Sequence, residues 1–394
     1  MPAKRHNKRK VIFGGWYQRT TLHLSEIYDL FALGHSTLPL STEKLRAFHG
    51  SLSFKSVTRQ SGYLEFIQAE TKTGIIIHYY EDGLYTLELE SSDVFDAQKI
   101  LEDYYENSLS PAISYIFSLG APTPKVLANI KTKHPTVVTA QVTDFDDYEI
   151  DHSKFGEVYS KVVSGNFAVY KTPNFIFVLS NHESIEILSS LVDMQIFFRE
   201  FKDQLEKYLN VHRIIWEEIS DLKERKQIKG KEIREARTKL DHYQKTINLI
   251  SSRINQMGTY IQTRQSIAKE IEIEGNLLKL YQYKFEVLSN TLIYIKELWK
   301  MTTDYLVSSI EVLEDLENTS LNNSVKSLQI ITSIGVIAGV LGYITRDSLP
   351  KPTLYGLIFL GILIFFSVLS NIIISLIYNN IRYKMKLPER KEDI

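Results

Sequence analysis

The sequence predicts an α/β or α+β domain in the N-terminal part of the chain, then a long helical stalk with coiled-coil character and two transmembrane helices. Three observations carry this prediction: β-like runs before residue 180, a heptad repeat from Leu278 onward, and two C-terminal apolar runs without Asp, Glu, Lys or Arg. The expected segments are a soluble domain (1–183), long charged helices (184–277), a stalk helix (278–326), a first span (327–345), an external loop (346–353), a second span (354–378) and a basic cytoplasmic tail (379–394).

Composition excludes several classes of protein. The chain has 394 residues, a formal net charge of −1 and no cysteine. Near-zero net charge gives no overall attraction for nucleic acid, so direct nucleic-acid binding is not expected. The lack of cysteine excludes disulfides, thiolate zinc sites and a cysteine nucleophile. The ten histidines show no paired metal-ligand spacing, and P-loop, GxGxxG and GxSxG motifs are absent, so we do not expect an enzyme.

The soluble domain is predicted from runs rich in Val, Ile, Tyr and Thr with partial alternation. These runs are 10–21, 63–68, 74–78, 84–89, 136–142, 165–170 and 174–179. Glu81-Asp82-Gly83 is typical of a hairpin turn between the third and fourth runs. Residues 92–105 follow a Ser/Asp cap and carry apolar residues at helical spacing, which predicts an amphipathic helix.

The helical part begins near Ser184, with a long helix predicted over 185–228. A highly charged section, 217–245, has Gly230 at its centre. It fits two solvated helix ends that meet at a turn, or else a basic ligand-binding patch.

A heptad seam is the clearest pattern in the stalk helix. Its positions are Leu278, Tyr281, Phe285, Leu288, Leu292, Ile295, Trp299, Thr302, Leu306, Ser309, Leu313, Leu316, Ser320 and Asn323. A helix over 278–326 would be about 70 Å long. The seam becomes more polar toward its C-terminal end. Small polar side chains around an axis suit a water-filled pore, and they are equally compatible with an ordinary coiled coil.

The two apolar runs, Ser327–Thr345 and Leu354–Tyr378, predict a membrane hairpin, because a bilayer core of about 30 Å needs roughly 20 helical residues. The apolar run after the basic N-terminus, Val11–Gly15, is too short for a signal peptide. The tail is basic at Arg382, Lys384, Lys386, Arg390 and Lys391. The positive-inside rule therefore predicts a multi-pass protein of the inner membrane with both termini in the cytoplasm and the lipid bilayer as a partner.

The order of these segments resembles the CorA family of divalent-cation channels. In that family the first span ends in Gly-Met-Asn, and here the corresponding residues are Gly342-Tyr343-Ile344. The resemblance places the pore and selectivity region at Asn323, Ser327, Gly335, Gly339, Gly342, Tyr343 and Ile344. Ile344 offers only its backbone carbonyl oxygen to a cation. The loop carries Arg346 and Lys351 against Asp347, and such a basic mouth disfavours cation selectivity.

Divergent CorA-like proteins without the signature include membrane effectors associated with type III CRISPR systems. Resemblance to these implies an antiviral channel that a nucleotide second messenger opens, either S-adenosylmethionine–AMP or a cyclic oligoadenylate. It also implies a homo-oligomer, usually a pentamer, and a small nucleotide as the ligand. The alternatives are a Mg²⁺ or Co²⁺ transporter of the CorA family and a membrane-anchored coiled-coil scaffold.

Two groups of residues are candidates for ligand contact. Gly14 and Gly15 permit close approach to the backbone, Trp16 and Tyr17 can stack on a base, and Arg19 can pair with phosphate. His152 and Lys171, elsewhere in the domain, complete this candidate site. Asp144, Asp146 and Asp147 are candidate ligands for Mg²⁺. The alternative interpretations are a first strand with buried aromatic residues and a solvated acidic loop.

Overall fold

The computed structural model describes residues 9–18, 23–119, 127, 134–181, 185–225, 227–344 and 354–384. The chain divides into two compact units. Unit 1 consists of Met1–Val211 and Leu249–Glu297, and unit 2 consists of His212–Asn248 and Leu298–Ile394. Three long helices contribute residues to both units: α7 (Ile185–Glu224), α8 (Gly230–Glu270) and α10 (Phe285–Ile344).

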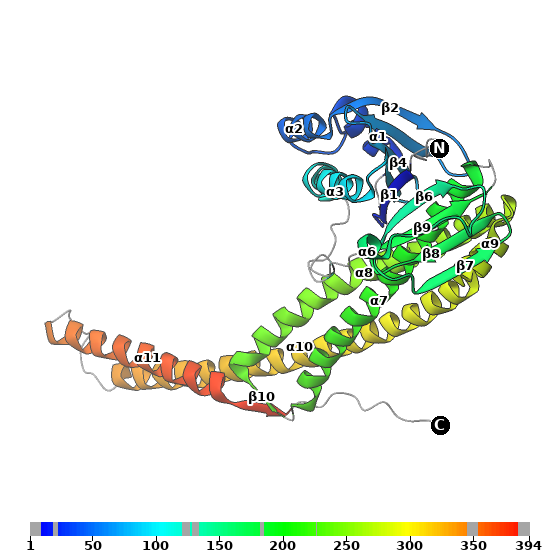
Figure 1. Cartoon of the computed structure of the whole chain (residues 1–394). Coiled ribbons are helices and arrows are strands. Elements are labelled where there is room, and N and C mark those ends of the chain that lie inside the picture. Colours follow the sequence, from blue (N-terminus) through cyan, green and yellow to red (C-terminus); the bar gives the residue numbers. More distant parts are fainter. Residues whose placement is uncertain are drawn as a thin grey trace, which may run out of the picture. The chain divides into compact units, whose positions relative to one another are not determined.

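Unit 1 is built on a nine-stranded sheet (Figure 1). Its strands are β1 (Arg9–Trp16), β2 (Phe54–Gln60), β3 (Phe66–Thr71), β4 (Ile76–Tyr80), β5 (Leu84–Ser91), β6 (Thr136–Gln141), β7 (Ser160–Ser164), β8 (Phe167–Lys171) and β9 (Phe175–Ser180). Their order is β2-β3-β4-β5-β1-β6-β9-β8-β7. The pairings are antiparallel except that between β6 and β9, which is parallel. Each of the seven predicted runs contributes a strand, which confirms the mixed α/β character of this region.

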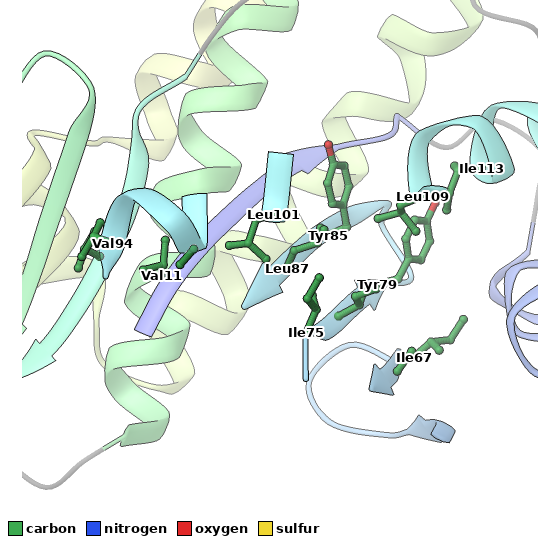
Figure 2. Packing of buried hydrophobic residues seen from close by; sticks show 14 of the residues in the cluster. Val11, Ile67, Ile75, Tyr79, Tyr85, Leu87, Val94, Leu101, Leu109 and Ile113 are labelled. Atoms are coloured by element: carbon green, nitrogen blue, oxygen red, sulfur yellow. The ribbon is translucent and has the colours of Figure 1, made fainter. Parts of the chain in front are cut away.

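One face of the sheet is covered by helices that belong to the same half of the chain. These are α1 (Leu24–Leu33), α2 (Thr42–Leu52), α3 (Val94–Tyr104), the π-helical η1 (Tyr105–Leu109) and α4 (Ser110–Phe117). Figure 2 shows Leu101 of α3 beside Leu87 of β5, within a core in which both side chains are fully buried. The predicted cap of α3 is confirmed, because the Asp93 carboxylate accepts hydrogen bonds from the backbone N–H groups of Phe95 and Asp96.

Helix α7 approaches β1 on the opposite side from this core. A Cβ built on Gly14 would lie 2.8 Å from Ile196 Cδ1 of α7 and 2.9 Å from the carbonyl oxygen of Tyr85. Only glycine therefore fits between the helix and the neighbouring strand. The Trp16 ring stacks on Phe201 of α7, with ring centroids 5.5 Å apart. Because side chains alternate along a strand, β1 contributes to packing on both faces of the sheet.

The predicted stalk consists of two helices instead of one continuous helix. Helix α9 (Glu274–Tyr281) ends where Gln282 takes up a left-handed conformation, with φ +60°, and α10 begins at Phe285. The seam is buried from Phe285 to Leu313, which confirms its heptad spacing over that stretch. Leu278 lies on α9 and is 43% exposed. Gln282 separates the first two seam positions from the others because a left-handed residue ends an α-helix.

The C-terminal apolar runs are helical: α10 continues without a break to Ile344, and α11 spans Leu354–Asn380. Within the stretches that the structure describes, no helix is both long enough and apolar enough to cross a membrane. This finding corrects two predictions, the pair of transmembrane helices at 327–345 and 354–378 and the multi-pass location in the inner membrane. The predictions combined the length of each run with its lack of charged residues, but no described helix meets the requirements of length and apolarity together. The predicted external loop lies outside the described residues.

Unit 2 contains parts of α7, α8 and α10, together with α11 and a small two-stranded sheet. The charged section predicted as two helix ends meeting at a turn contains the end of α7, β10 (Gln227–Lys229) and the start of α8. Strand β10 pairs with β11 (Arg382–Lys384), so residues 382–384 of the predicted basic tail form a strand. Arg237 of α8 makes ion pairs with Glu314 and Glu317 of α10.

Candidate functional site

Trp16 and Tyr17, the predicted stacking residues, lie among other aromatic side chains. Besides Phe201, Trp16 contacts the rings of Phe197 and Tyr260, and its indole Nε1 donates a hydrogen bond to the Asp82 carbonyl oxygen at 2.7 Å. The rings of Tyr85 and Phe117 pack against Tyr17. Burial raises the pKa of Tyr17 well above its usual value, and the nearby Tyr105 raises it further.

His152 and Lys171 lie on other elements of unit 1. His152 is the exposed first residue of α6 (His152–Phe155), and Lys171 ends β8. No hydrogen bond, ion pair or ring contact within the described stretches joins either of them to Trp16 or Tyr17. Arg19 lies outside the described residues. Ligand contact by these five residues remains a prediction.

The Lys171 ammonium group is unusual because its surroundings include no carboxylate partner within the described part of the chain. Its Nζ lies 5.6 Å from the centre of the Tyr281 ring, a cation–π arrangement. Partial burial lowers the pKa of Lys171. The hydroxyl of Tyr281 is buried and has no hydrogen-bond partner among the residues described. Among the predicted ligand residues that the structure describes, Lys171 therefore carries a charge without an ion pair.

The predicted metal ligands, Asp144, Asp146 and Asp147, are exposed. Asp146 pairs with Lys161 at 3.1 Å, and its side chain is 86% exposed. Asp144 caps the backbone N–H of Asp146. Over the described residues, no group of three or more His, Asp or Glu side chains is arranged to hold a metal ion.

The predicted pore positions all lie on α10. Ser327 donates a hydrogen bond to the Asn323 carbonyl oxygen at 3.1 Å, one turn earlier in the helix. A Cβ on Gly335 or Gly339 would meet no atom of the described structure within 4 Å. Gly342, Tyr343 and Ile344 form the last turn of the helix. A role for these residues in a pore remains a prediction.

A buried ionic network occupies the side of the sheet where α7 and α8 pack. Arg264 of α8 donates two hydrogen bonds to Asp82 in the β4–β5 turn, with Nε 2.6 Å from Oδ2 and Nη2 2.9 Å from Oδ1. Their side chains are 4% and 3% exposed. Asp82 also accepts a hydrogen bond from the Leu84 backbone N–H. The predicted hairpin turn is therefore the point at which α8 is fixed to the sheet.

The same network reaches α7 through a tyrosine. The Arg264 guanidinium carbon lies 5.0 Å from the centre of the Tyr80 ring on β4. Tyr80 Oη donates a hydrogen bond to Asp193 Oδ2 of α7 at 2.6 Å. Burial raises the pKa of Asp193, although the Tyr80 hydrogen bond and the Arg264 charge oppose this effect. Charged and hydrogen-bonded groups thus hold α7 and α8 to a hairpin that lies more than 100 residues before the residues they contribute.

A third carboxylate lies farther along the same face. Glu88 of β5 pairs with Lys10 of β1, with Oε2 2.8 Å from Nζ, and only 5% of the Glu88 side chain is exposed. His78 Nδ1 of β4 lies 3.7 Å from the other Glu88 oxygen. The Thr86 hydroxyl is within 3.4 Å of the same His78 nitrogen. Counting Asp82 and Asp193, the network contains three buried carboxylates, and sequence reasoning identified none of them as functional.

The chain has been compared with known proteins. No protein-family model matches it, and no curated protein matches its sequence. Among solved structures, it is similar to the CorA magnesium transporter from Methanocaldococcus jannaschii. The two share 12% sequence identity, and the similarity covers 63% of this chain and 92% of the transporter chain at a TM-score of 0.28.

Proposed function

We propose that this protein is a ligand-controlled homo-oligomer without enzymatic activity, with a CorA-like order of segments. In this proposal, unit 1 senses a small ligand and the long helices carry the response. The observation that supports it is the ionic network at the β4–β5 turn. Asp82 holds α8, Tyr80 holds Asp193 of α7, and both helices contribute residues to unit 2.

A buried ionic network is better suited to transmitting a ligand response than to stabilising the fold. Removing two charges from water is costly, so a buried ion pair contributes little net stability compared with a well-packed apolar contact. Its geometry is nevertheless specific, because an Arg–carboxylate pair must keep both hydrogen bonds to offset desolvation. A ligand that displaces the hairpin would therefore displace α7 and α8 together.

The finer proposal concerns the ligand and the biological outcome. We infer that the ligand is a nucleotide second messenger, S-adenosylmethionine–AMP or a cyclic oligoadenylate, and that the response is antiviral. Support comes from the replacement of the CorA signature by Gly342-Tyr343-Ile344 and from the Lys171 ammonium, which lacks an ion pair among the described residues and could receive a phosphate.

Calorimetry on the full chain with each messenger tests the ligand, with AMP and S-adenosylmethionine as controls. We expect one messenger to bind and Lys171→Gln to weaken binding at least tenfold. Lys161→Gln serves as the matched control, because Lys161 already pairs with Asp146. Absence of binding by every messenger would overturn the nucleotide proposal.

Hydrogen exchange and native mass spectrometry test the remaining parts. The bound messenger should change amide exchange in α7 around Asp193 and in α8 around Arg264. Binding without such a change would contradict the coupling. A monomer at micromolar concentration, with and without messenger, would contradict the homo-oligomer.

A scaffold is the second candidate, favoured by the buried seam of α10. A scaffold needs helix packing and no small ligand. It predicts that partners bind equally well in the presence and absence of any nucleotide, and that the Asp82→Asn variant assembles like the parent protein.

A further inference from the structure

A cleft of about 380 Å³ opens in unit 1 around α9. Its lining combines apolar and charged side chains, namely Leu278, Tyr283, Phe285, Glu274, Lys284 and Glu286. These come from α9, from the connection that follows it, and from the first turn of α10. The cleft shares no lining residue with the ionic network or with the predicted ligand, metal and pore residues, and it includes the seam positions Leu278 and Phe285.

The charged side chains of the cleft are not paired with one another or with other residues that the structure describes. Within the described stretches, neither Lys284 nor Glu274 nor Glu286 forms a salt bridge, although opposite charges line the same cleft. One cation and two carboxylates are therefore available to a ligand at the same place.

The aromatic wall of the cleft is held rigidly. The Tyr283 ring stacks on Phe198 with centroids 4.6 Å apart and an interplanar angle of 9°. Its neighbour in the stack, Tyr281, lies 5.4 Å away at 18°. Because Phe198 and Tyr281 already stack on its ring, the Tyr283 side chain has little rotational freedom left to lose when a ligand binds. The wall is preorganised for binding.

The backbone around α9 is also strained. Among the described residues, positive φ angles at non-glycine positions occur at Ser53, Glu272 and Gln282. Two of these, Glu272 with φ +57° and Gln282 with φ +60°, flank α9 directly. Left-handed backbone at a residue with a side chain costs of order 1 kcal/mol and is concentrated at functional sites. This observation is independent of the charges in the cleft.

We propose that this cleft binds a small zwitterion of the α-amino-acid type with an apolar side chain. The ligand carboxylate pairs with Lys284, its ammonium group pairs with Glu274 or Glu286, and its side chain contacts Leu278 and Phe285. A simple anion would meet two carboxylates, and a simple cation would meet Lys284. A nucleobase would need an exposed ring face, whereas Tyr283 is stacked with Phe198 and Tyr281. The site goes beyond the proposed nucleotide sensing and does not rest on it.

The test uses the full chain and three matched probes: L-leucine, 3-methylbutylamine, which lacks the carboxylate, and N-acetyl-L-leucine, which lacks the ammonium group. Binding is followed by calorimetry and by the change in melting temperature. We expect L-leucine to bind at least tenfold more tightly than either analogue. Two results would overturn the proposal: equal binding of L-leucine and the amine, or no binding of L-leucine at 10 mM. A dissociation constant of 10 mM corresponds to a binding free energy of roughly −2.7 kcal/mol.

Variants assign the binding to the cleft. Lys284→Gln should weaken L-leucine at least tenfold and leave 3-methylbutylamine unchanged, because only the amino acid carries the partner of Lys284. Lys279→Gln is the control, since Lys279 is an exposed residue of α9 that does not line the cleft. Circular dichroism establishes that both variants fold. Equal effects of the two substitutions would overturn the site.

Discussion

Arg264 and Asp82 are 182 residues apart in the sequence and form a buried bidentate ion pair. Asp82 belongs to a hairpin turn, where an aspartate ordinarily caps local backbone N–H groups. It performs that role toward Leu84 and also receives the guanidinium of α8. The pair therefore connects a turn fixed by local sequence with a helix whose position is fixed by tertiary packing.

The first prediction concerns the removal of one member of this pair. Asp82→Asn leaves the Arg264 charge buried without its partner, so the free energy of unfolding should fall by about 3–5 kcal/mol. Urea denaturation measures the change. Glu70→Gln, which breaks the exposed Lys55–Glu70 pair, should cost less than about 1 kcal/mol.

The double variant Asp82→Asn/Arg264→Met sharpens this test. Replacing a buried ion pair by an apolar group avoids the unpaired charge, so part of the lost stability should return. If the loss of stability in the double variant equalled the sum of the losses in Asp82→Asn and Arg264→Met, the two residues would not act as a pair.

Local patterns predicted much of unit 1, and the places where prediction failed have physical causes. The buried strands were found because they are rich in Val, Ile, Tyr and Thr, with partial alternation along some of them. Strands β2 and β7 were missed because they lie at the two edges of the sheet, where polar residues such as those of β2 are exposed. The break before α10 was missed because Gln282, which is not glycine, takes the left-handed conformation.

The candidate site was less predictable than the fold. Trp16 and Tyr17 carry chemistry that suits a nucleobase, and the same chemistry suits an aromatic core, in which the structure places them. The ionic network joins residues from β1, β4, β5, α7 and α8, and no spacing along the chain indicates such contacts. The heptad seam of α10 was predictable from Phe285 to Leu313 because burial of a helix follows its own periodicity.

The second prediction concerns the close packing of α7 on β1. Gly14→Ala places a methyl group against Ile196 and the Tyr85 carbonyl oxygen, and the backbone oxygen cannot move without disturbing the strand. We expect a loss of about 1–3 kcal/mol in the free energy of unfolding. Gly50→Ala in α2 is the control, because its Cβ would meet nothing within 4 Å, and it should be neutral or stabilising by up to about 1 kcal/mol. An equal effect at both positions would contradict the packing.

The third prediction is a pH dependence in unit 1. Burial raises the pKa of Asp193 in the folded protein above its value of roughly 3.9 in the unfolded chain. Between these two pKa values the folded state binds more protons than the unfolded chain. The contribution of Asp193 to the free energy of unfolding is therefore fully present below the unfolded pKa and is lost as pH rises through the folded pKa. The stability of the parent protein relative to Asp193→Asn should fall as pH rises from 4. Urea denaturation of both proteins at successive pH values measures this change. A parent protein that gains stability relative to Asp193→Asn as pH rises would contradict the raised pKa.

The fourth prediction has the opposite sign and belongs to unit 2. The His212 ring packs against Trp216 and Trp299, its Nε2 has no hydrogen-bond partner among the described residues, and burial lowers its pKa. The unfolded chain therefore binds more protons below the ordinary histidine pKa of roughly 6.5, and the contribution of neutral His212 is present above that value. It is lost as pH falls through the folded pKa. The stability of the parent protein relative to His212→Phe should consequently decrease between pH 7.5 and pH 5. Denaturation of both proteins across this range, together with histidine titration followed by NMR, checks the direction of the change. A parent protein that gains stability relative to the variant on acidification would contradict the prediction, because it would show that the folded state favours charged His212.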